Sequence, residues 1–319
     1  FNSLFLGETA VLKNIYANTP IVNSTAIQGD HGGSVWLKME AQQPTGSFKL
    51  RGISHACITY QKKGAQGFIC ASGGNAGIAV AYTGKNLGIP VTIVVPETTS
   101  QRAIDAIQKE EAHVIIHGKS YQEAHTEAIG LISKEQIYIH SFDDPLLWEG
   151  HASMIDEIKA AEIIPDQIVL SVGGGGLLCG VMEGLARNQW SHIPVLAVET
   201  HGAHSLAHAL NNQNHLGIDK ISSIATSLGA KKVARKAFEE AQKKTVSNHI
   251  VSDREAVAAC LQFSKDHQLV VEPACGAALA PVYAGHPSLK DKKNILVIVC
   301  GGVGVGIEQL EAWNIAYNQ

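Results

Sequence analysis

Short apolar runs and amphipathic segments alternate along most of this 319-residue chain. Apolar runs with the length of buried strands lie at 67–71, 91–95 and 113–116. Segments with helical periodicity follow them at 78–87, 102–109 and 121–132. Because the connections are short, the pattern predicts an α/β fold with a parallel sheet covered on both faces by helices.

The rest of the chain has the same alternation. Further strands are predicted at 34–39, 167–172, 195–198 and 295–299, and a helix at 177–187. Three strands that are far apart in the sequence run into small-residue loops at 72–77, 173–176 and 301–302. Ligands of parallel sheets bind beyond the carboxyl ends of the strands, so we predict that these loops line one cleft. No linker separates two halves, which favours a second lobe inserted into the first.

The composition narrows the classes of function. Hydrophobic residues make up 45% of the chain and charged residues 17%, as in an ordinary globular protein. A net charge of −4 provides no basic field for nucleic acid. Six scattered cysteines without a Cys-x-x-Cys pair favour reduced, buried thiols. We find neither a membrane-length apolar run nor a signal-like start, and we therefore predict no membrane partner and a cytoplasmic location.

Lys49 is the first candidate for chemistry. It follows a small, turn-forming run at 44–47 and the apolar Phe48. A lysine held near a cavity would be desolvated, which lowers its pKa and makes it a nucleophile. The alternative is a lysine in the first turn of an ordinary helix, with Thr45 or Ser47 as the N-cap. The local sequence leaves both interpretations open.

The tetraglycine at 173–176, between a strand and a helix, indicates a phosphate site. Without Cβ atoms the backbone can point several N–H groups into one concavity at a helix N-terminus. The alternative is a turn that only permits tight packing. No G-x-G-x-x-G spacing is present, and residues 113–120 lack the first glycine of a nucleotide-binding P-loop, which disfavours NAD and ATP. A reactive lysine with a separate phosphate cradle suits pyridoxal 5′-phosphate instead.

Other motifs admit more than one interpretation. The turn at 72–77 could bind a substrate carboxylate, with Asn75 bonded to a phenolic oxygen, or could simply cap a helix. Cys300 could face a ring nitrogen or be a core thiol. His201, His204 and His208 could bind a metal only if they share a helical face, which Gly202 disfavours. The acidic pair Asp143 and Asp144 precedes a proline and is predicted to form a turn.

Taken in order, these motifs resemble those of a known family. They lie at 43–49, 72–77, 142–151, 171–180, 272–278 and 299–302. The chain resembles the fold-type-II pyridoxal-phosphate enzymes, the tryptophan synthase β-like superfamily. Within it the chain is similar to the single-domain L-serine dehydratase/L-threonine deaminase group. Two sites depart from many relatives, because Gly74 and Ser227 stand where alanine is common.

The resemblance implies a role for each matching residue. Lys49 would form the imine with the cofactor, Phe48 would pack on its ring, Asn75 would contact its 3′ oxygen and Cys300 would face its ring nitrogen. The cofactor phosphate would be bound by Gly173, Gly174, Gly175, Gly176 and Leu177. The substrate carboxylate would be held by Ser72, Gly73, Asn75 and Ala76. A monovalent cation such as K⁺ would bind at Glu199, Ala203, Ser205, Leu228 and Ala230.

The resemblance also implies an architecture and a reaction. The fold would have a large lobe at 1–42 and 149–319, a small inserted lobe at 43–148, and the cofactor in the cleft between them, in a homodimer. The implied reaction is α,β-elimination through Lys49, which converts L-serine to pyruvate and ammonia and L-threonine to 2-oxobutyrate and ammonia. Serine racemase and 3-hydroxyaspartate ammonia-lyase are alternatives on the same scaffold. A non-catalytic, cofactor-binding regulatory protein is a remote alternative, which the intact Lys49 disfavours.

Overall fold

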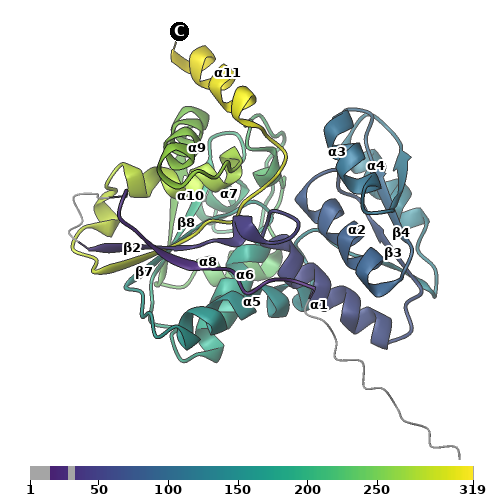
Figure 1. Ribbon diagram of the computed structural model, residues 1–319, viewed down its shortest axis with the longest axis horizontal. Helices are drawn as coiled ribbons and strands as arrows, with labels where there is room; N and C mark the ends of the chain where they lie inside the picture. Colours follow the sequence, from purple (N-terminus) through teal and green to yellow (C-terminus); the bar gives the residue numbers. More distant parts are fainter. Residues whose placement is uncertain (1–14, 28–32, 319) are drawn as a thin grey trace, which may run out of the picture.

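The fold contains two sheets with a long helix between them. The computed structural model describes residues 15–27 and 33–318. The parts of the predicted large lobe at 1–14, 28–32 and 319 therefore lie outside the described residues. Figure 1 shows the two sheets side by side, with α1 (Lys49–Lys62) crossing between them.

The larger sheet has six strands and is mostly parallel. Its order is β1 (Ile21–Ser24), β2 (Ser34–Lys38), β10 (Asn294–Ile298), β7 (Gln167–Ser171), β8 (Val195–Thr200) and β9 (Val246–Val251). Only β1 is antiparallel to its neighbour. In the register, Val297 lies between Leu37 and Val169. All residues of β7 and β8 are buried, as expected for strands covered on both faces.

The smaller sheet has four parallel strands from the middle of the chain. Its order is β5 (His113–Ile116), β4 (Val91–Val95), β3 (Gly67–Cys70) and β6 (Gln136–Tyr138). The predicted strands of both sheets are confirmed to within a residue or two at their ends. The sequence pattern missed β1, β6 and β9, which are edge strands and mix polar with apolar residues. The boundaries of the small lobe at 43 and 148 stay a prediction.

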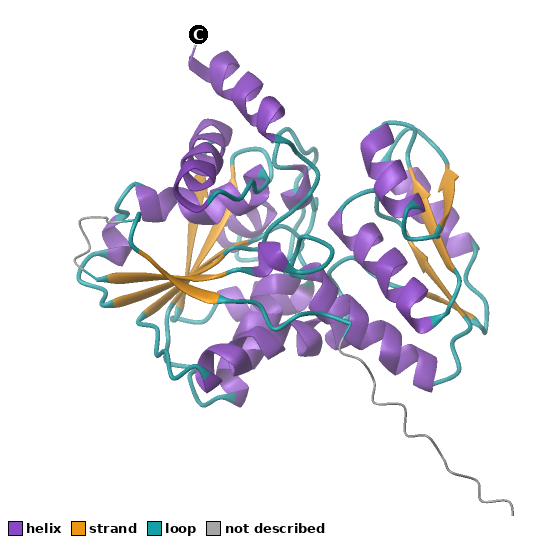
Figure 2. Ribbon diagram, viewed as in Figure 1, coloured by secondary structure: helices purple, strands orange, loops and turns teal. Residues whose placement is uncertain are grey.

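Helices cover the sheets and join them (Figure 2). The remaining helices are α2 (Asn75–Leu87), α3 (Gln101–Gln108), α4 (Tyr121–Gly130), α5 (Pro145–Ala160), α6 (Gly176–Arg187), α7 (Ser205–Asn211), α8 (Arg235–Ala241), α9 (Asp253–His267), α10 (Pro273–Tyr283) and α11 (Ile307–Asn318). Helix α1 packs against α2 on one side and α5 on the other. Helix α10 is almost wholly buried and packs against β7, β8 and α9. The predicted α/β fold class is confirmed, and the sheets are held around a shared central layer of helices.

No helix among the described residues is long and apolar enough to cross a membrane.

Candidate active site

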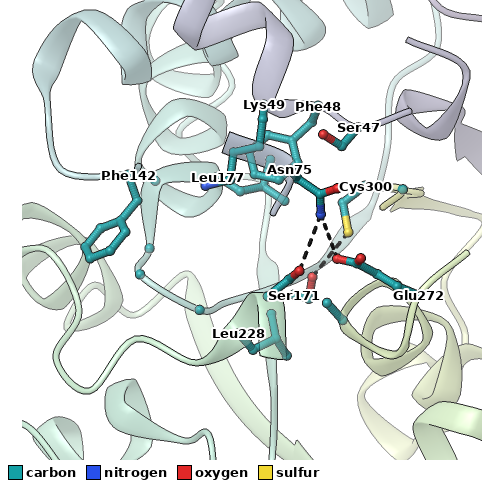
Figure 3. Close-up of a pocket in the computed structure, with 17 residues that line it drawn as sticks. Ser47, Phe48, Lys49, Asn75, Phe142, Ser171, Leu177, Leu228, Glu272 and Cys300 are labelled. Carbon is teal, nitrogen blue, oxygen red and sulfur yellow. Dashed lines mark hydrogen bonds between the residues drawn. The ribbon is translucent and has the colours of Figure 1, made fainter. Parts of the chain in front are cut away.

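Residues from distant parts of the chain line one pocket, shown in Figure 3. They come from the starts of α1, α2 and α10, the segments that follow β6, β7 and β10, and the short 3-10 helix Thr226–Leu228. The lining residues are Ser47, Phe48, Lys49, Asn75, Phe142, Ser171, Gly173, Gly174, Gly175, Gly176, Leu177, Ser227, Leu228, Glu272, Ala274, Cys300 and Gly301. The three small-residue segments converge as predicted, although only Asn75 of 72–77 and Gly301 of 301–302 line the pocket beside the tetraglycine.

Lys49 is the first residue of α1, and its amine faces this pocket. Its Nζ donates a hydrogen bond to the carbonyl oxygen of Ser141 at 2.6 Å and lies 5.2 Å from the centre of the Phe48 ring. Burial lowers the pKa of Lys49 to about 8, although Cys70, Cys300 and Glu272 partly oppose this effect. Both interpretations of the sequence were therefore partly right, because a helix begins here and its first side chain is a desolvated amine.

The predicted N-caps were wrong. The N-cap of α1 is Phe48, which makes no side-chain capping hydrogen bond. The hydroxyls of Thr45 and Ser47 are buried and have no hydrogen-bond partner in the described part of the chain. The amide of Gly52, in the first turn, instead donates to His151 Nδ1 of α5 at 3.1 Å. A side chain distant in sequence thus does part of the capping.

The segment before Lys49 is held by the loop that follows β10. The amide of Phe48 donates to the carbonyl oxygen of Cys300 at 3.1 Å, and Ser47 forms an isolated bridge with Gly301. Gly301 has a φ of +88°, and a Cβ there would lie 2.2 Å from the carbonyl oxygen of Gly46. This close approach of two backbones places Lys49 beside the end of the central strand.

The tetraglycine forms a concave turn between β7 and α6. A Cβ at Gly173 would lie 2.7 Å from the Cα of Leu228, and one at Gly174 would lie 2.2 Å from the Phe142 ring. Gly175 has a φ of +89° and is the N-cap of α6, with no side-chain cap. The first amides of α6 therefore face the pocket unblocked by any side chain, and this is the geometry that holds a phosphate. The residues present fit pyridoxal 5′-phosphate, since the amine and the cradle line the same pocket.

Asn75 begins α2, and both ends of its amide are hydrogen-bonded. Its Nδ2 donates to Glu272 Oε1 at 2.8 Å and toward Ser227 Oγ at 3.3 Å. Its Oδ1 accepts from the amide of Val303 at 3.2 Å. The predicted turn at 72–77 is thus a turn only as far as Gly74, and the helix starts three residues earlier than predicted.

The other predicted carboxylate ligands lie beside Asn75 but outside the lining of the pocket. Ser72 Oγ accepts from the amide of Gly74 at 3.3 Å, which folds the hydroxyl back on its own loop. Gly73 packs toward Thr99, and Ala76 is buried in the first turn of α2. Their role in binding a substrate stays a prediction.

Cys300 follows β10 and is buried at the floor of the pocket. Its Sγ lies 3.6 Å from Ser171 Oγ, at the end of the neighbouring strand β7. The thiol and the hydroxyl together present weakly polar groups, with no carboxylate between them. This environment suits a neutral ring nitrogen.

The predicted cation ligands lie around the end of β8. Glu199 is fully buried and accepts hydrogen bonds from the amides of Leu206 and Ala207, each at 2.8 Å, and from Asn248 Nδ2 at 2.9 Å. Burial raises the pKa of Glu199 to about 7, against these hydrogen bonds. Ser205 Oγ is buried without a partner among the described residues. Of the remaining predicted ligands, Ala203 is buried, Leu228 lines the pocket and the amide of Ala230 bonds to the Leu228 carbonyl. Cation binding at these residues stays a prediction.

The histidine alternative fails. Helix α7 begins at Ser205, so His201 and His204 precede it and cannot share a helical face with His208. In residues 15–27 and 33–318 no three His, Cys, Asp or Glu side chains are grouped to hold a metal ion. The acidic pair is part of a turn as predicted, because Asp144 is the N-cap of α5 and accepts from the amide of Leu146 at 2.8 Å.

The sequence analysis missed several residues that line the pocket. Glu272 is the most consequential, because it is an acidic group with 5% exposure beside Asn75. Burial raises its pKa, and hydrogen bonds from Ser227 and Asn75 oppose that effect. Its position just before Pro273 at a helix start was visible in the sequence. The direction of its side chain was not.

Comparison with known proteins identifies similar chains. The family model described as pyridoxal-phosphate dependent enzyme matches residues 12–301. A human protein named L-serine dehydratase/L-threonine deaminase is 44% identical over 93% of this chain and 94% of its own. A human protein named serine dehydratase-like is 43% identical over 96% of both chains.

Solved structures show the same similarity. An L-serine ammonia-lyase from Rhizomucor miehei superimposes with a TM-score of 0.90 at 33% identity, over 96% of this chain and 100% of that one. Maize serine racemase superimposes with a TM-score of 0.84 at 25% identity, over 95% of this chain and 94% of that one.

Proposed function

Since the chain belongs to the pyridoxal-phosphate dependent enzyme family, we propose that it is an ammonia-lyase that deaminates L-serine to pyruvate and L-threonine to 2-oxobutyrate. The observation that carries the proposal is that the desolvated Lys49 amine and the tetraglycine cradle line one pocket. A human and a mouse relative, 44% and 42% identical, are both named L-serine dehydratase/L-threonine deaminase.

The cofactor, when bound, withdraws electrons from the substrate Cα and so makes its proton removable. Residues of the chain bind the phosphate, flank the ring and move the proton. The first amides of α6 and the glycines at 173–176 bind the phosphate, and Phe48 and Asn75 flank the space for the ring. Lys49 Nζ, which is substantially neutral near pH 8, takes the proton from the substrate Cα. Cys300 and Ser171 present a thiol and a hydroxyl rather than a carboxylate at the floor of the pocket, which favours elimination over reactions that need a protonated ring.

One observation disfavours racemization. A racemase needs a second proton-carrying group on the side of the substrate opposite its lysine. Ser72, the candidate in the turn before α2, bonds to the Gly74 amide and lies outside the pocket lining. Elimination requires no such group.

The proposal includes features that stay predictions. They are the small lobe at 43–148, the homodimer, the cytoplasmic location, the cation site at Glu199 and the carboxylate contacts of Ser72, Gly73 and Ala76.

The test measures pyruvate and 2-oxobutyrate release from L-serine and L-threonine with added pyridoxal 5′-phosphate. We expect Lys49→Ala to lower the rate by about 100- to 10,000-fold and to abolish the visible band of the lysine-bound cofactor. Lys62→Ala is the control, because Lys62 is exposed at the other end of α1. A visible band without ketoacid, accompanied by D-serine or by turnover of 3-hydroxyaspartate, would overturn the reaction while keeping the cofactor. A rate unaffected by Lys49→Ala would remove the proposed mechanism.

A further inference from the structure

Glu272 is an acidic group in the pocket that the proposed function does not use. It directly precedes α10, and only 5% of its surface is exposed. Figure 3 shows its carboxyl group pointing toward Asn75, on the side of the pocket where Cys300 lies. An acid buried in this way costs free energy unless its hydrogen bonds are made, so its partners indicate what it does.

The chain leaves a space shaped for this carboxyl group. A Cβ at Gly302 would lie 1.9 Å from the Cδ of Glu272, and a Cβ at Gly304 would lie 3.3 Å from its Oε2. Gly302 has a φ of +119°, a backbone conformation that favours glycine. The loop after β10 therefore wraps closely around the carboxyl group and restricts its movement.

The same loop and the same carboxyl group together determine the orientation of the Asn75 amide. Val303, between the two glycines, donates its amide to Asn75 Oδ1 at 3.2 Å. Glu272 Oε1 accepts from Asn75 Nδ2 at 2.8 Å. If the amide were flipped, its nitrogen would face the Val303 amide and its oxygen would face the Glu272 carboxyl group. Both hydrogen bonds would then be lost. The amide is thus held with its nitrogen end on the Glu272 side.

The two hydrogens of Asn75 Nδ2 are held unequally. An amide nitrogen carries two hydrogens, and Glu272 takes one of them in the shorter bond. The second bond, to Ser227 Oγ, is long at 3.3 Å. A negatively charged oxygen on a ligand would be a stronger acceptor than this hydroxyl.

We propose that Glu272 is a positioning residue, which acts through Asn75 by holding one of its N–H groups so that the other is presented to the ring oxygen of the cofactor. The inference rests on the proposed function, since it assumes that the pocket holds pyridoxal 5′-phosphate. Glu272 acts here as a hydrogen-bond acceptor. This role survives protonation, because a carboxylic acid keeps an acceptor oxygen.

The surroundings favour this role over one in proton transfer. The titratable groups that face Glu272 are Lys49 at the start of α1, Cys300 after β10 and Cys260 in α9. Burial raises the pKa of Glu272, so that its proton is retained more firmly than that of an exposed glutamate. Because an acceptor oxygen is present in both protonation states of the carboxyl group, its function should depend little on pH across the neutral range.

The test is a double-mutant cycle on the affinity for pyridoxal 5′-phosphate, measured by equilibrium dialysis of the holoenzyme. The variants are Glu272→Ala, Asn75→Ala, their combination and Glu272→Gln. We expect each alanine variant to weaken binding by about tenfold or more, because a buried polar group loses its partner. The double variant should be no weaker than Asn75→Ala to within about twofold, because Glu272 acts only through Asn75. Glu272→Gln should restore most of the affinity, since its Oε1 can still accept.

Three outcomes would overturn the inference. They are additive losses in the double variant, an unchanged affinity in Glu272→Ala, or a Glu272→Gln variant as weak as Glu272→Ala. The pH at which the visible band of the bound cofactor changes gives a second readout, and we expect it to move in the same direction in Glu272→Ala and Asn75→Ala. Asp156→Asn is the control, because Asp156 pairs with Arg187 on the surface.

This test also separates two kinds of failure. If the wild-type protein binds the cofactor but releases no ketoacid, the proposed reaction is wrong, and the binding cycle still decides the role of Glu272. If it releases ketoacid and the cycle is additive, only the inference about Glu272 is wrong.

Discussion

Two buried lysines show how the surroundings of one residue decide its chemistry. Burial lowers the pKa of both Lys38 and Lys49. Lys38 donates to the Glu157 carboxylate at 2.5 Å and to the Thr19 carbonyl oxygen at 2.6 Å, and the Glu157 carboxylate opposes the lowering of its pKa. Lys49 has only the Ser141 carbonyl oxygen at 2.6 Å, with no carboxylate in a direct salt bridge among the described residues. The uncompensated lysine is the one that can lose its proton near neutral pH.

The burial of Lys49 therefore lowers the free energy of unfolding by an amount that depends on pH. The pKa falls from 10.5 to about 8 on folding, so below pH 8 both folded and unfolded chains carry the proton and the buried ammonium destabilises the fold. Between pH 8 and 10.5 the unfolded chain binds more protons, and this penalty disappears as the pH rises. Without cofactor, we expect Lys49→Met to be more stable than wild type by up to about 3 kcal/mol at pH 7, with the gap shrinking toward pH 10.

Urea unfolding of both proteins at several pH values measures this gap. Lys62→Met serves as the control, and its difference from wild type should not change with pH over this range. A gap that stays constant for Lys49→Met would show that the Lys49 ammonium is not destabilised by burial.

At the scale of elements, the turns that enter α2 and α6 differ in how closely they are packed. A Cβ at Gly173 would press on the backbone of Leu228 at 2.7 Å, whereas a Cβ at Gly74 would meet nothing within 4 Å. Gly74 also has a φ of −115°, which alanine adopts without strain. The sequence presented both as glycine-rich turns before helices. Only the packing distinguishes an essential glycine from a replaceable one.

Gly173→Ala and Gly74→Ala form a matched pair for this difference. We expect Gly173→Ala to lower the free energy of unfolding by about 1–3 kcal/mol and to weaken the binding of pyridoxal 5′-phosphate, because the turn must shift away from Leu228. Gly74→Ala should change the free energy of unfolding by less than about 1 kcal/mol. Thermal unfolding with and without cofactor measures both effects. Equal effects of the two variants would contradict this account of the loops.

Strand prediction from the sequence succeeded for the central strands and for the edge strand β5, and failed for the edge strands β1, β6 and β9. Strands β4 and β5 were predicted at their observed bounds, because both have the sequence of a short apolar run. Strand β9 has the sequence VSNHIV and β6 has QIY, and neither stands out from loop sequence. An edge strand has one neighbour only, so its selection depends on the sheet that it joins.

At the scale of the whole molecule, a buried charge network joins segments that flank the two sheets. Arg51 of α1 donates to Glu40 Oε2 of η1 (Glu40–Gln42) at 2.7 Å and to Glu157 Oε1 of α5 at 2.7 Å. Arg51 and Glu40 have 0% exposure. Lys38 of β2 also bonds to Glu157. Arg51 lies two residues after Lys49 in α1, so the network connects the helix that carries Lys49 to the larger sheet.

Arg51→Met tests this network. We expect it to lower the free energy of unfolding by about 3–5 kcal/mol, because the carboxylates of Glu40 and Glu157 would lose the guanidinium group that pairs with both. Arg187→Ala removes an exposed pair with Asp156 and should cost less than about 1 kcal/mol. Urea unfolding at pH 7 compares the two. Similar small losses in both variants would mean that the network contributes little to holding α1 in place.

The sequence by itself determined the α/β class, the central strands, and the identity of Lys49, the tetraglycine and Cys300 as candidates. Each of these is a local signal, carried by apolar runs, by glycines next to helices or by a lysine in an unusual setting. The tertiary structure alone decided which atoms meet. It gave Lys49 a carbonyl instead of a carboxylate, placed His151 at the start of α1, removed Ser72 from the pocket lining and brought Glu272 to Asn75 across 197 residues. Such contacts depend on side-chain direction and on the closure of distant segments, and no local pattern in the chain encodes either.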